Sequence, residues 1–155
     1  MENTYTQLYI QYIFSVKGRE NLIREKFREE LEKIICGIIS NYKCKTYAIY
    51  CNADHTHVFV GMHPVMSPSK LMEQVKSGSS KWLNDKKYIL GKFSWQDGFG
   101  AFTYSKSQID QVVKYVLNQA EHHKKQSFKE EYLSFLDKFD VDYNPKYLFD
   151  WYDDI

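Results

Sequence analysis

The stretch Asp54-His55-Thr56-His57-Val58-Phe59-Val60 decides how the chain is organised. In an extended strand alternate side chains leave opposite faces, so His55 and His57 point one way while Thr56 and its alternates point the other. Neutral imidazole is the commonest protein ligand for divalent metals, and an i, i+2 pair presents two ring nitrogens to one ion. Two interpretations follow from this short pattern: a metal site, or a polar strand face with two solvated histidines.

Length and composition indicate one globular domain. A chain of 155 residues can bury a real core, and an aromatic content of 17% suits either tight packing or stacking surfaces for bases. The net charge of +1 argues nothing about nucleic acid, but residues 130–155 hold six more acids than bases, so residues 1–129 are moderately basic. A basic body is compatible with phosphate binding, and an acidic tail with a solvating role.

Cysteine use and hydropathy point to the cytoplasm. Cys36, Cys44 and Cys51 are an odd number without CxxC spacing, which indicates buried thiols in a reducing compartment. No apolar run approaches the roughly 18 residues of a membrane span. The first residues lack a signal-peptide pattern. We therefore expect a soluble, cytoplasmic protein with no membrane partner.

Periodicity predicts the order strand, helix, strand, strand, helix, strand, followed by further helices. The first three strands are expected over residues 5–16, 45–51 and 55–63, and residues 95–104 begin as a glycine-punctuated aromatic loop and become a fourth strand. The helices are expected over 19–40, 68–83, 108–125 and 128–139. Asn52-Ala53-Asp54 predicts a hairpin turn, and Ser67 a helix N-cap before Pro68. This order is typical of an α+β, ferredoxin-like split βαβ antiparallel sheet with helices on one face. The histidine pair then lies on the opposite face.

A second group of polar residues lies on the helix expected over residues 108–125. Tyr115 and Gln119 are one turn apart, and His122 continues the same stripe. A tyrosyl oxygen can attack a phosphodiester to give a covalent phosphotyrosine, an attack that needs a metal on the phosphate. Gln119 can supply an oxygen ligand, with His122 as its rival. Taken alone, a helical tyrosine is more often a packing residue.

Several separated motifs carry a family resemblance. His55-Thr56-His57, followed some sixty residues later by Tyr115-Val116-Leu117-Asn118-Gln119, resembles the single-tyrosine HUH transposases of small bacterial insertion sequences and their repeat-associated relatives. The segments Trp95-Gln96-Asp97-Gly98-Phe99-Gly100-Ala101-Phe102 and Glu121-His122-His123-Lys124-Lys125 are also similar to that family. The chain departs from it at Thr56, where the family usually has a bulky apolar residue. The Thr56 hydroxyl should point to the helix-covered face and needs a partner there.

The resemblance implies a function and a set of residue roles. Tyr115 would be the nucleophile, and His55, His57 and Gln119 the ligands of Mg²⁺ or Mn²⁺. The substrate would be single-stranded DNA with hairpins at element ends, cleaved and rejoined through a 5′-phosphotyrosine by a homodimer. It also implies a catalytic domain over residues 1–129 with a tyrosine-bearing helix. Residues 130–155 are expected to form an acidic, aromatic C-terminal extension of the same domain. We expect this extension to be a cap that can be deleted from about Phe139 onward without loss of function.

Candidate DNA contacts are basic and aromatic residues distributed along the chain. Lysines and one histidine are candidates for phosphate contacts, and Asp54 either closes its turn or orients an imidazole. Exposed aromatics could stack unpaired bases. The candidates are Lys76, Lys81, Lys114, His122, Lys124, Lys125, Trp95 and Phe99.

Two alternatives from other classes remain open at this point. A metal-free RNA-recognition type of module predicts aromatic residues where His55 and His57 stand, and the sequence does not have them. An inactive or domesticated relative would be a dimeric DNA-binding protein on the same fold. The joint presence of His55, His57, Tyr115 and Gln119 argues against such decay.

Overall fold

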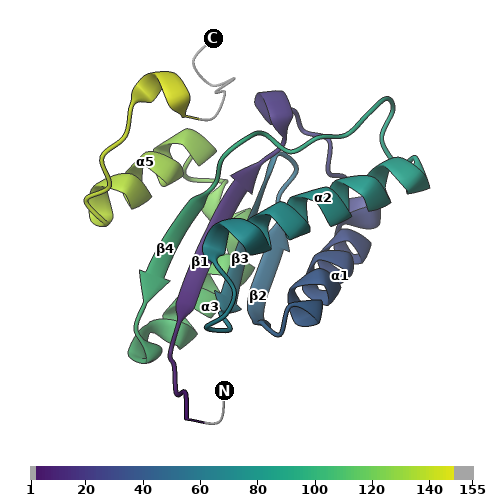
Figure 1. Cartoon of the computed structure of the whole chain (residues 1–155). Helices are drawn as coiled ribbons and strands as arrows, with labels where there is room; N and C mark the ends of the chain where they lie inside the picture. Colours follow the sequence, from purple (N-terminus) through teal and green to yellow (C-terminus); the bar gives the residue numbers. More distant parts are fainter. Residues whose placement is uncertain (1–2, 149–155) are drawn as a thin grey trace.

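The computed structural model describes residues 3–148 and contains one four-stranded sheet. Its strands are β1 (Tyr9–Ser15), β2 (Lys45–Cys51), β3 (His55–Gly61) and β4 (Gly100–Tyr104), all paired antiparallel in the order β2-β3-β1-β4. Helices α1 (Glu25–Asn41) and α2 (Pro68–Lys86) cover one face of this sheet (Figure 1). The predicted ferredoxin-like order and the hairpin of β2 and β3 are confirmed.

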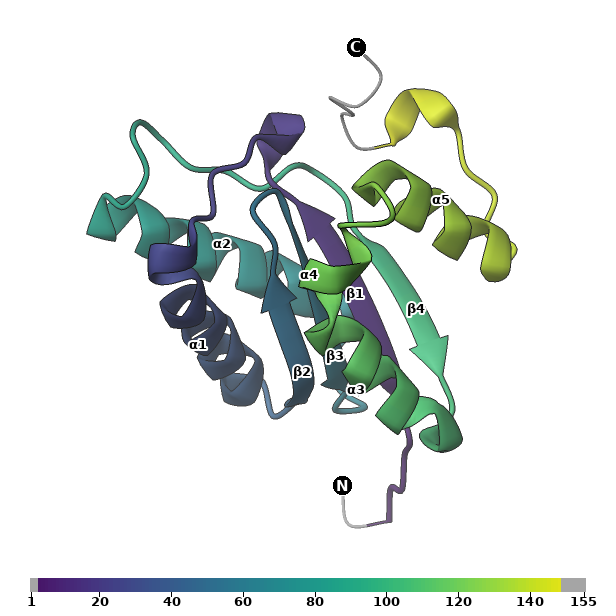
Figure 2. The ribbon, with the colours of Figure 1, turned by 180° about the vertical axis from the view of Figure 1, so that it is seen from behind.

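The opposite face of the sheet is also covered. Helices α3 (Ile109–Leu117), α4 (Gln119–His122) and α5 (Phe128–Lys138) lie across it, seen in front of the strands in Figure 2. Short 3₁₀ helices η1 (Lys17–Arg19), η2 (Lys106–Gln108) and η3 (Pro145–Tyr147) complete the described elements. The sheet is therefore enclosed between two helical layers.

The main core lies between the sheet and helices α1 and α2. It joins alternate residues of β1 and β3 with the apolar stripes of the two helices; its largest fully buried members include Tyr12, Phe14, Leu31, Ile35, Ile39, Leu71 and Met72. Gly78 lets the helices approach, because a Cβ there would lie 2.6 Å from Ile38 Cδ1. The predicted N-cap holds, since Ser67 Oγ accepts from the Lys70 N–H at 3.1 Å.

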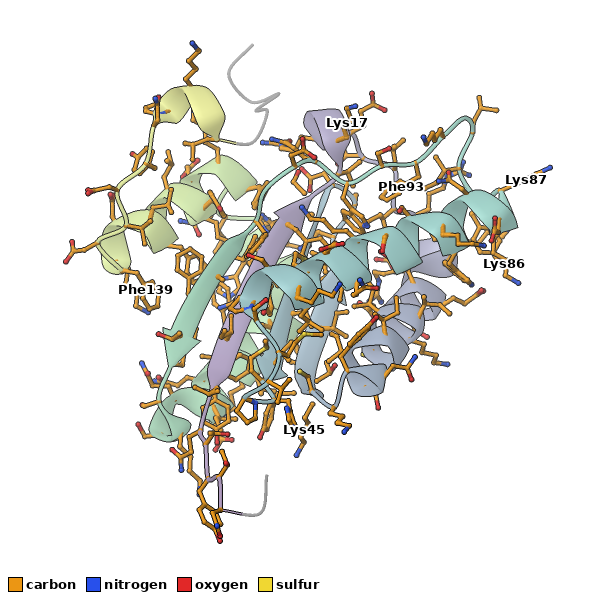
Figure 3. The ribbon with its side chains drawn as sticks, in the orientation of Figure 1. Lys17, Lys45, Lys86, Lys87, Phe93 and Phe139 are labelled. Atoms are coloured by element: carbon orange, nitrogen blue, oxygen red, sulfur yellow. The ribbon has the colours of Figure 1, made fainter. Side chains whose placement is uncertain are left out.

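Two smaller clusters fix the helices on the other face. Ala48 and Phe59 pack against α3 through Val112 and Val116. The second cluster joins β1 and β4 to α5, and consists of Ile13, Phe102, Phe128, Tyr132, Phe135 and Leu136. Phe139 extends it: the ring lies between the end of α5 and β4 (Figure 3), with its centroid 5.0 Å from that of Phe102.

Three predicted boundaries are wrong, each for a physical reason. The first strand begins at Tyr9, not at residue 5, because its partner strands β3 and β4 end opposite Tyr9, at Gly61 and Tyr104. The first helix begins at Glu25, not Arg19, since η1 and an extended segment place the buried Arg19 against Asp54. The helix expected to run to residue 125 breaks at Asn118, whose backbone leaves helical geometry (φ −99°, ψ 22°).

Candidate metal centre and tyrosine site

Strand β3 places both histidines inside the protein. His55 and His57 stand opposite Ser15 and Ile13 of β1, on the face away from α1 and α2. Their exposed fractions are 2% and 0%, because α4 and α5 lie over that face. The two rings are therefore not solvated, which removes the alternative of a polar, water-facing strand.

A hydrogen bond fixes the orientation of each ring. His55 Nδ1 donates to Asp54 Oδ1 at 2.7 Å, and His57 Nδ1 donates to Gln11 Oε1 at 2.8 Å. Arg19 in turn holds the other Asp54 oxygen at 2.9 Å. Asp54 thus orients an imidazole as well as closing the turn. With Nδ1 protonated in both rings, both Nε2 lone pairs point toward the same space.

Two further residues bring ligand atoms to this space. His123, which caps the end of α4, donates through Nδ1 to the Gln126 carbonyl at 3.1 Å, and its Nε2 lies 3.1 Å from His55 Nε2. Glu131 of α5 places Oε1 3.0 Å from His57 Nε2 and 3.3 Å from His123 Nε2. The four ligand atoms of His55, His57, His123 and Glu131 lie within 4.8 Å of one another.

Gln119 faces the same cluster and is fully buried. Its Oε1 lies 3.0 Å from His123 Nε2 and accepts a hydrogen bond from Asn52 Nδ2 at 3.2 Å. Its Nε2 donates to Glu131 Oε2 at 3.2 Å. The side-chain oxygen of Gln119 is consequently directed at the imidazole nitrogens, where a ligand oxygen would be needed.

Tyr115 lies at the edge of the cluster in the same chain. Its hydroxyl donates to Glu131 Oε2, and its ring centroid is 6.0 Å from that of His57. The His122 ring packs against the Tyr115 ring at 4.4 Å. His122 therefore contacts the tyrosine, as the predicted stripe requires, while His123 takes the place beside the other imidazoles.

Burial and charge perturb these groups strongly. Burial raises the pKa of Tyr115, and the Glu131 carboxylate raises it further. Burial alone would raise the pKa of Glu131, but the neighbouring imidazoles, His57 first among them, hold it far below its usual range. Burial lowers the pKa of His57, whereas Asp54 and Glu131 outweigh burial and raise that of His55. Opposed perturbations in one buried cluster are typical of functional sites.

A cavity of about 260 Å³ opens beside the phenol. Its lining includes Gln11, Gln111, Tyr115, Glu131 and Lys138. Amide groups and one lysine can bind the polar edges and phosphates of a nucleotide. Access to Tyr115 is thus available from this side of α3 and α5.

The candidate DNA contacts on and beside α2 lie on the far side of the sheet from the histidines. Lys76 Nζ donates to the carbonyls of Gln96 and Gly98 at 2.8 and 2.6 Å, and Lys81 pairs with Asp85 at the surface. Trp95 is 7% exposed, because its ring packs in the main core and its Nε1 donates to Ser79. The Trp95 ring has no face available for a base.

The other candidates differ in exposure. Phe99 is half-buried at the edge of the main core, 5.9 Å from the Tyr12 ring. Lys114, Lys124 and Lys125 are exposed on the side that carries the tyrosine, and Lys124 pairs with Glu121 at 3.0 Å. The exposed lysines of the α3–α4 side are therefore better placed for a strand that reaches Tyr115 than those of α2.

Sequence reasoning did not select His123 and Glu131, although each had a signal. His123 follows Gln119 by four residues, so the two share one helical face. Glu131 lies among Phe128, Tyr132 and Phe135 on the apolar stripe of α5, and a carboxylate on such a stripe requires a partner. No sequence pattern indicated which partner that would be.

The donor set fits a divalent metal ion. Three imidazole nitrogens, one carboxylate oxygen and one amide oxygen converge, and hydrogen bonds orient the three imidazoles and the amide. Two unprotonated Nε2 atoms at 3.1 Å repel each other unless a cation or a proton lies between them. His55, His57, His123, Glu131 and Gln119 are the residues that could hold such an ion.

Comparison with known proteins agrees with this geometry. Residues 4–119 match the family model described as IS200-like transposase. The fold is similar to a candidate transposase from Deinococcus radiodurans R1 (TM-score 0.60, 18% identity, 76% of this chain and 94% of that one). It is also similar to a REP-associated tyrosine transposase bound to a REP hairpin (TM-score 0.58, 14% identity, 78% and 72%). No curated protein matches the chain.

Proposed function

Because the chain belongs to the IS200-like transposase family, we propose that it cleaves and rejoins single-stranded DNA with Tyr115 as nucleophile and a divalent metal ion, Mg²⁺ or Mn²⁺. The observation that carries this proposal is the Tyr115 hydroxyl held beside the buried cluster of His55 and His57. A phenol in that position has a nucleophilic oxygen next to a site for a Lewis acid, which are the two requirements of phosphodiester transfer.

The reaction exchanges one phosphodiester for another. The Tyr115 oxygen attacks phosphorus, the bond from phosphorus to the 3′-oxygen breaks, and the phenolic proton ends on the released 3′-hydroxyl. The product is a 5′-phosphotyrosine, and attack by a 3′-hydroxyl reverses the step and joins strands. The Glu131 carboxylate accepts the hydrogen bond of the phenol and so orients its oxygen.

The metal site contributes charge and orientation. A divalent ion there would polarise the scissile phosphate and stabilise the charge that develops on it. The proposed ligands of this ion are His55, His57 and Gln119. Hydrogen bonds with Asp54, Gln11 and Asn52 direct their donor atoms to one place. The buried surroundings exclude water, which strengthens electrostatic interactions within the site.

The proposed substrate is a single strand bearing a hairpin. The relative bound to a REP hairpin supports this substrate class, and the exposed Lys114, Lys124 and Lys125 together with the cavity beside Tyr115 support a DNA path on the α3–α4 side. Within residues 3–148 no helix is long and apolar enough to cross a membrane. A cytoplasmic location is part of the proposal, since the DNA substrate is there.

A homodimer, which the family resemblance implies, is also part of the proposal. Tyr115 and the histidines of one chain already face each other, so a second copy is not required to assemble the cluster. Its contribution would be a second DNA-binding site for the paired element ends. Light scattering on the purified chain, with and without hairpin DNA, measures this directly.

The decisive experiment detects the covalent intermediate. The chain is incubated with a pool of single-stranded hairpin oligonucleotides in Mg²⁺, Mn²⁺ or EDTA, and products are analysed by denaturing electrophoresis and intact mass. We expect a metal-dependent adduct with the wild-type chain and none with Tyr115→Phe, which should still bind DNA. Tyr143→Phe, at an exposed tyrosine of the C-terminal segment, is the matched control and should form the adduct. Binding of a cognate hairpin without any adduct would instead indicate an inactive DNA-binding relative.

A further inference from the structure

We propose that α5 and the residue that follows α4 complete the metal site: His123 and Glu131 are metal ligands together with His55 and His57, and Glu131 holds the Tyr115 phenol with its second carboxylate oxygen. This inference rests on the proposed function, in which a divalent ion acts with Tyr115. It gives α5 a direct part in the active site, although this helix lies beyond residues 4–119, which match the family model.

The three imidazoles are oriented alike. Each Nδ1 of His55, His57 and His123 donates to a fixed oxygen, so each Nε2 carries its lone pair toward the centre of the cluster. An amide N–H from Asn52 already approaches one of these lone pairs, on His55, at 3.1 Å. A hydrogen bond from Nδ1 to an oxygen is the usual support for a metal-bound histidine. His123 has this support just as the two strand histidines do.

The spacing of the donors matches the ligand shell of one ion. With metal–ligand bonds of about 2.1 Å, adjacent ligands lie roughly 3.0 to 3.4 Å apart. Glu131 Oε1 lies 3.0 Å from His57 Nε2 and 3.3 Å from His123 Nε2. His123 Nε2 lies 3.1 Å from His55 Nε2. These three separations lie in the range that coordination requires, and the separation of His55 Nε2 from Glu131 Oε1, 3.7 Å, is slightly longer.

Glu131 is difficult to explain without a cation. Its side chain is 2% exposed, and within residues 3–148 its ion-pair contacts are all with imidazoles, those of His55, His57 and His123. A buried carboxylate is costly unless it is paired with positive charge or binds a metal. A divalent ion between Glu131 and three neutral imidazoles satisfies the carboxylate and the nitrogen lone pairs together.

The ligand chemistry narrows the choice of ion. Mg²⁺ prefers oxygen ligands and keeps several waters. Imidazole is a better ligand for Co²⁺ and Zn²⁺ than for Mn²⁺, and a better ligand for Mn²⁺ than for Mg²⁺. Three nitrogens and one carboxylate therefore favour a first-row transition metal over Mg²⁺. We expect Mn²⁺ and Co²⁺ to bind at least tenfold more tightly than Mg²⁺.

Glu131 also connects the ion to the nucleophile. One carboxylate oxygen faces the imidazoles, while the other accepts hydrogen bonds from the Tyr115 hydroxyl and Gln119 Nε2. An ion bound at Oε1 fixes the carboxylate, and the carboxylate then fixes the phenol. Glu131 is thus a metal ligand and, for Tyr115, a positioning residue.

Metal binding in the absence of DNA tests the ligand set. Mn²⁺ affinity is measured by calorimetry, and free Mn²⁺ by electron paramagnetic resonance, for the full chain and its variants. We expect Glu131→Gln and His123→Ala each to weaken binding by about tenfold or more. The neighbouring Glu130→Gln is the matched control, because its side chain is exposed and lies outside the cluster, and its Mn²⁺ affinity should stay within threefold of wild type.

A measurement on the unaltered chain guards against variants that fold poorly. Hydrogen exchange of the α5 amides, followed by mass spectrometry, should slow when Mn²⁺ is added, because the ion anchors the helix through Glu131. Unchanged exchange over residues 128–138 at saturating Mn²⁺ would overturn the proposal. So would folded Glu131→Gln and His123→Ala chains with wild-type affinity.

Strand cleavage separates this inference from the proposed function. Glu131→Gln should raise the Mn²⁺ concentration that gives half-maximal adduct formation, and the control Glu130→Gln should not. If the Tyr115 adduct forms while Glu131→Gln binds Mn²⁺ normally, the ligand assignment fails and the nuclease function stands. If the variants lose Mn²⁺ but wild type forms no adduct on a cognate hairpin, the ligand assignment stands and the nuclease function fails.

Discussion

The ring of Phe128 lies flat against the ring of His55, with 3.7 Å between centroids and 7° between planes. Phe128 is the first residue of α5, and the Arg19 guanidinium lies 5.8 Å from the centroid of its ring. The start of α5 therefore restricts the orientation of an imidazole in β3. Packing and site geometry depend on the same contact.

Phe128→Ala should accordingly affect both stability and metal binding. Loss of a buried ring leaves a cavity, and we expect the free energy of unfolding to fall by about 3–5 kcal/mol. His55 loses its stacking partner, so Mn²⁺ affinity should fall as well. Denaturant unfolding and calorimetry measure the two effects. Phe128→Leu, which retains most of the volume, should recover much of the stability; equal losses in both variants would contradict this explanation.

Gln11→Leu tests the support of His57. Gln11 Oε1 accepts a hydrogen bond from His57 Nδ1, and Gln11 Nε2 donates one to the Tyr104 hydroxyl at 3.0 Å. An apolar side chain at this position leaves both partner groups unpaired. We expect Mn²⁺ affinity to fall by about 10–100-fold, the usual effect of removing a residue that orients a metal-bound histidine. Gln7→Leu, at an exposed position of the same segment, is the control and should bind normally. Wild-type affinity in Gln11→Leu would exclude this role.

Thr56→Val should stabilise the protein. The Thr56 hydroxyl is fully buried on the face covered by α1 and α2, as predicted, and among residues 3–148 it has no hydrogen-bond partner other than the weakly bonding Cys51 thiol. Valine has the same shape without the buried polar atom, so we expect a gain of about 1 kcal/mol, or about 2–4 °C in Tm. Thr103→Val, at an exposed site of β4, should change stability by less than about 0.5 kcal/mol. A lower Tm for Thr56→Val would show that the hydroxyl has a real partner.

One half-buried tyrosine, Tyr104, and one buried tyrosine, Tyr132, predict that the folded chain is sensitive to alkali. Burial raises the pKa of Tyr104 and of Tyr132 to about 12, whereas an unfolded tyrosine titrates near pH 10. Between these values the unfolded chain has lost protons that the folded chain retains, so the stabilising contribution is complete below about pH 10 and is lost as pH rises toward 12. Denaturant unfolding at pH 8 to 11.5 measures the decline. Tyr132→Phe should make it shallower; an unchanged slope would contradict this origin.

Truncations separate the dispensable tail from the essential helix. A chain that ends after Asp140 keeps α5 and the Phe139 contact with Phe102 and Tyr104, so we expect Mn²⁺ affinity within threefold of the full chain (Figure 3). A chain that ends after Gln126 loses Glu131 and exposes the cluster around Ile13 and Phe102. It should lose Mn²⁺ binding and aggregate. Full metal affinity in the shorter chain would contradict a role for α5.

Much of the fold follows from local sequence patterns. Alternation predicts the strands, and the Asn52-Ala53-Asp54 turn predicts the hairpin that carries the histidines. The boundaries that failed were set by distant contacts: β1 begins at Tyr9 because β3 and β4 end opposite it, and Arg19 stays out of α1 because Asp54 holds it. Such contacts have no local signature.

The site divides in the same way. The i, i+2 spacing of His55 and His57 and the i, i+4 spacing of Tyr115 and Gln119 are fixed by the geometry of strand and helix, so the sequence alone determined which residues share a face. Tertiary structure decided which residue from a distant part of the chain meets each of these side chains. His57 and Glu131 are 74 residues apart, and the packing of α5 on β1 and β4 brings His57 Nε2 and Glu131 Oε1 to 3.0 Å. Local backbone geometry sets the direction of a side chain, and the burial of apolar surface between elements sets what it meets.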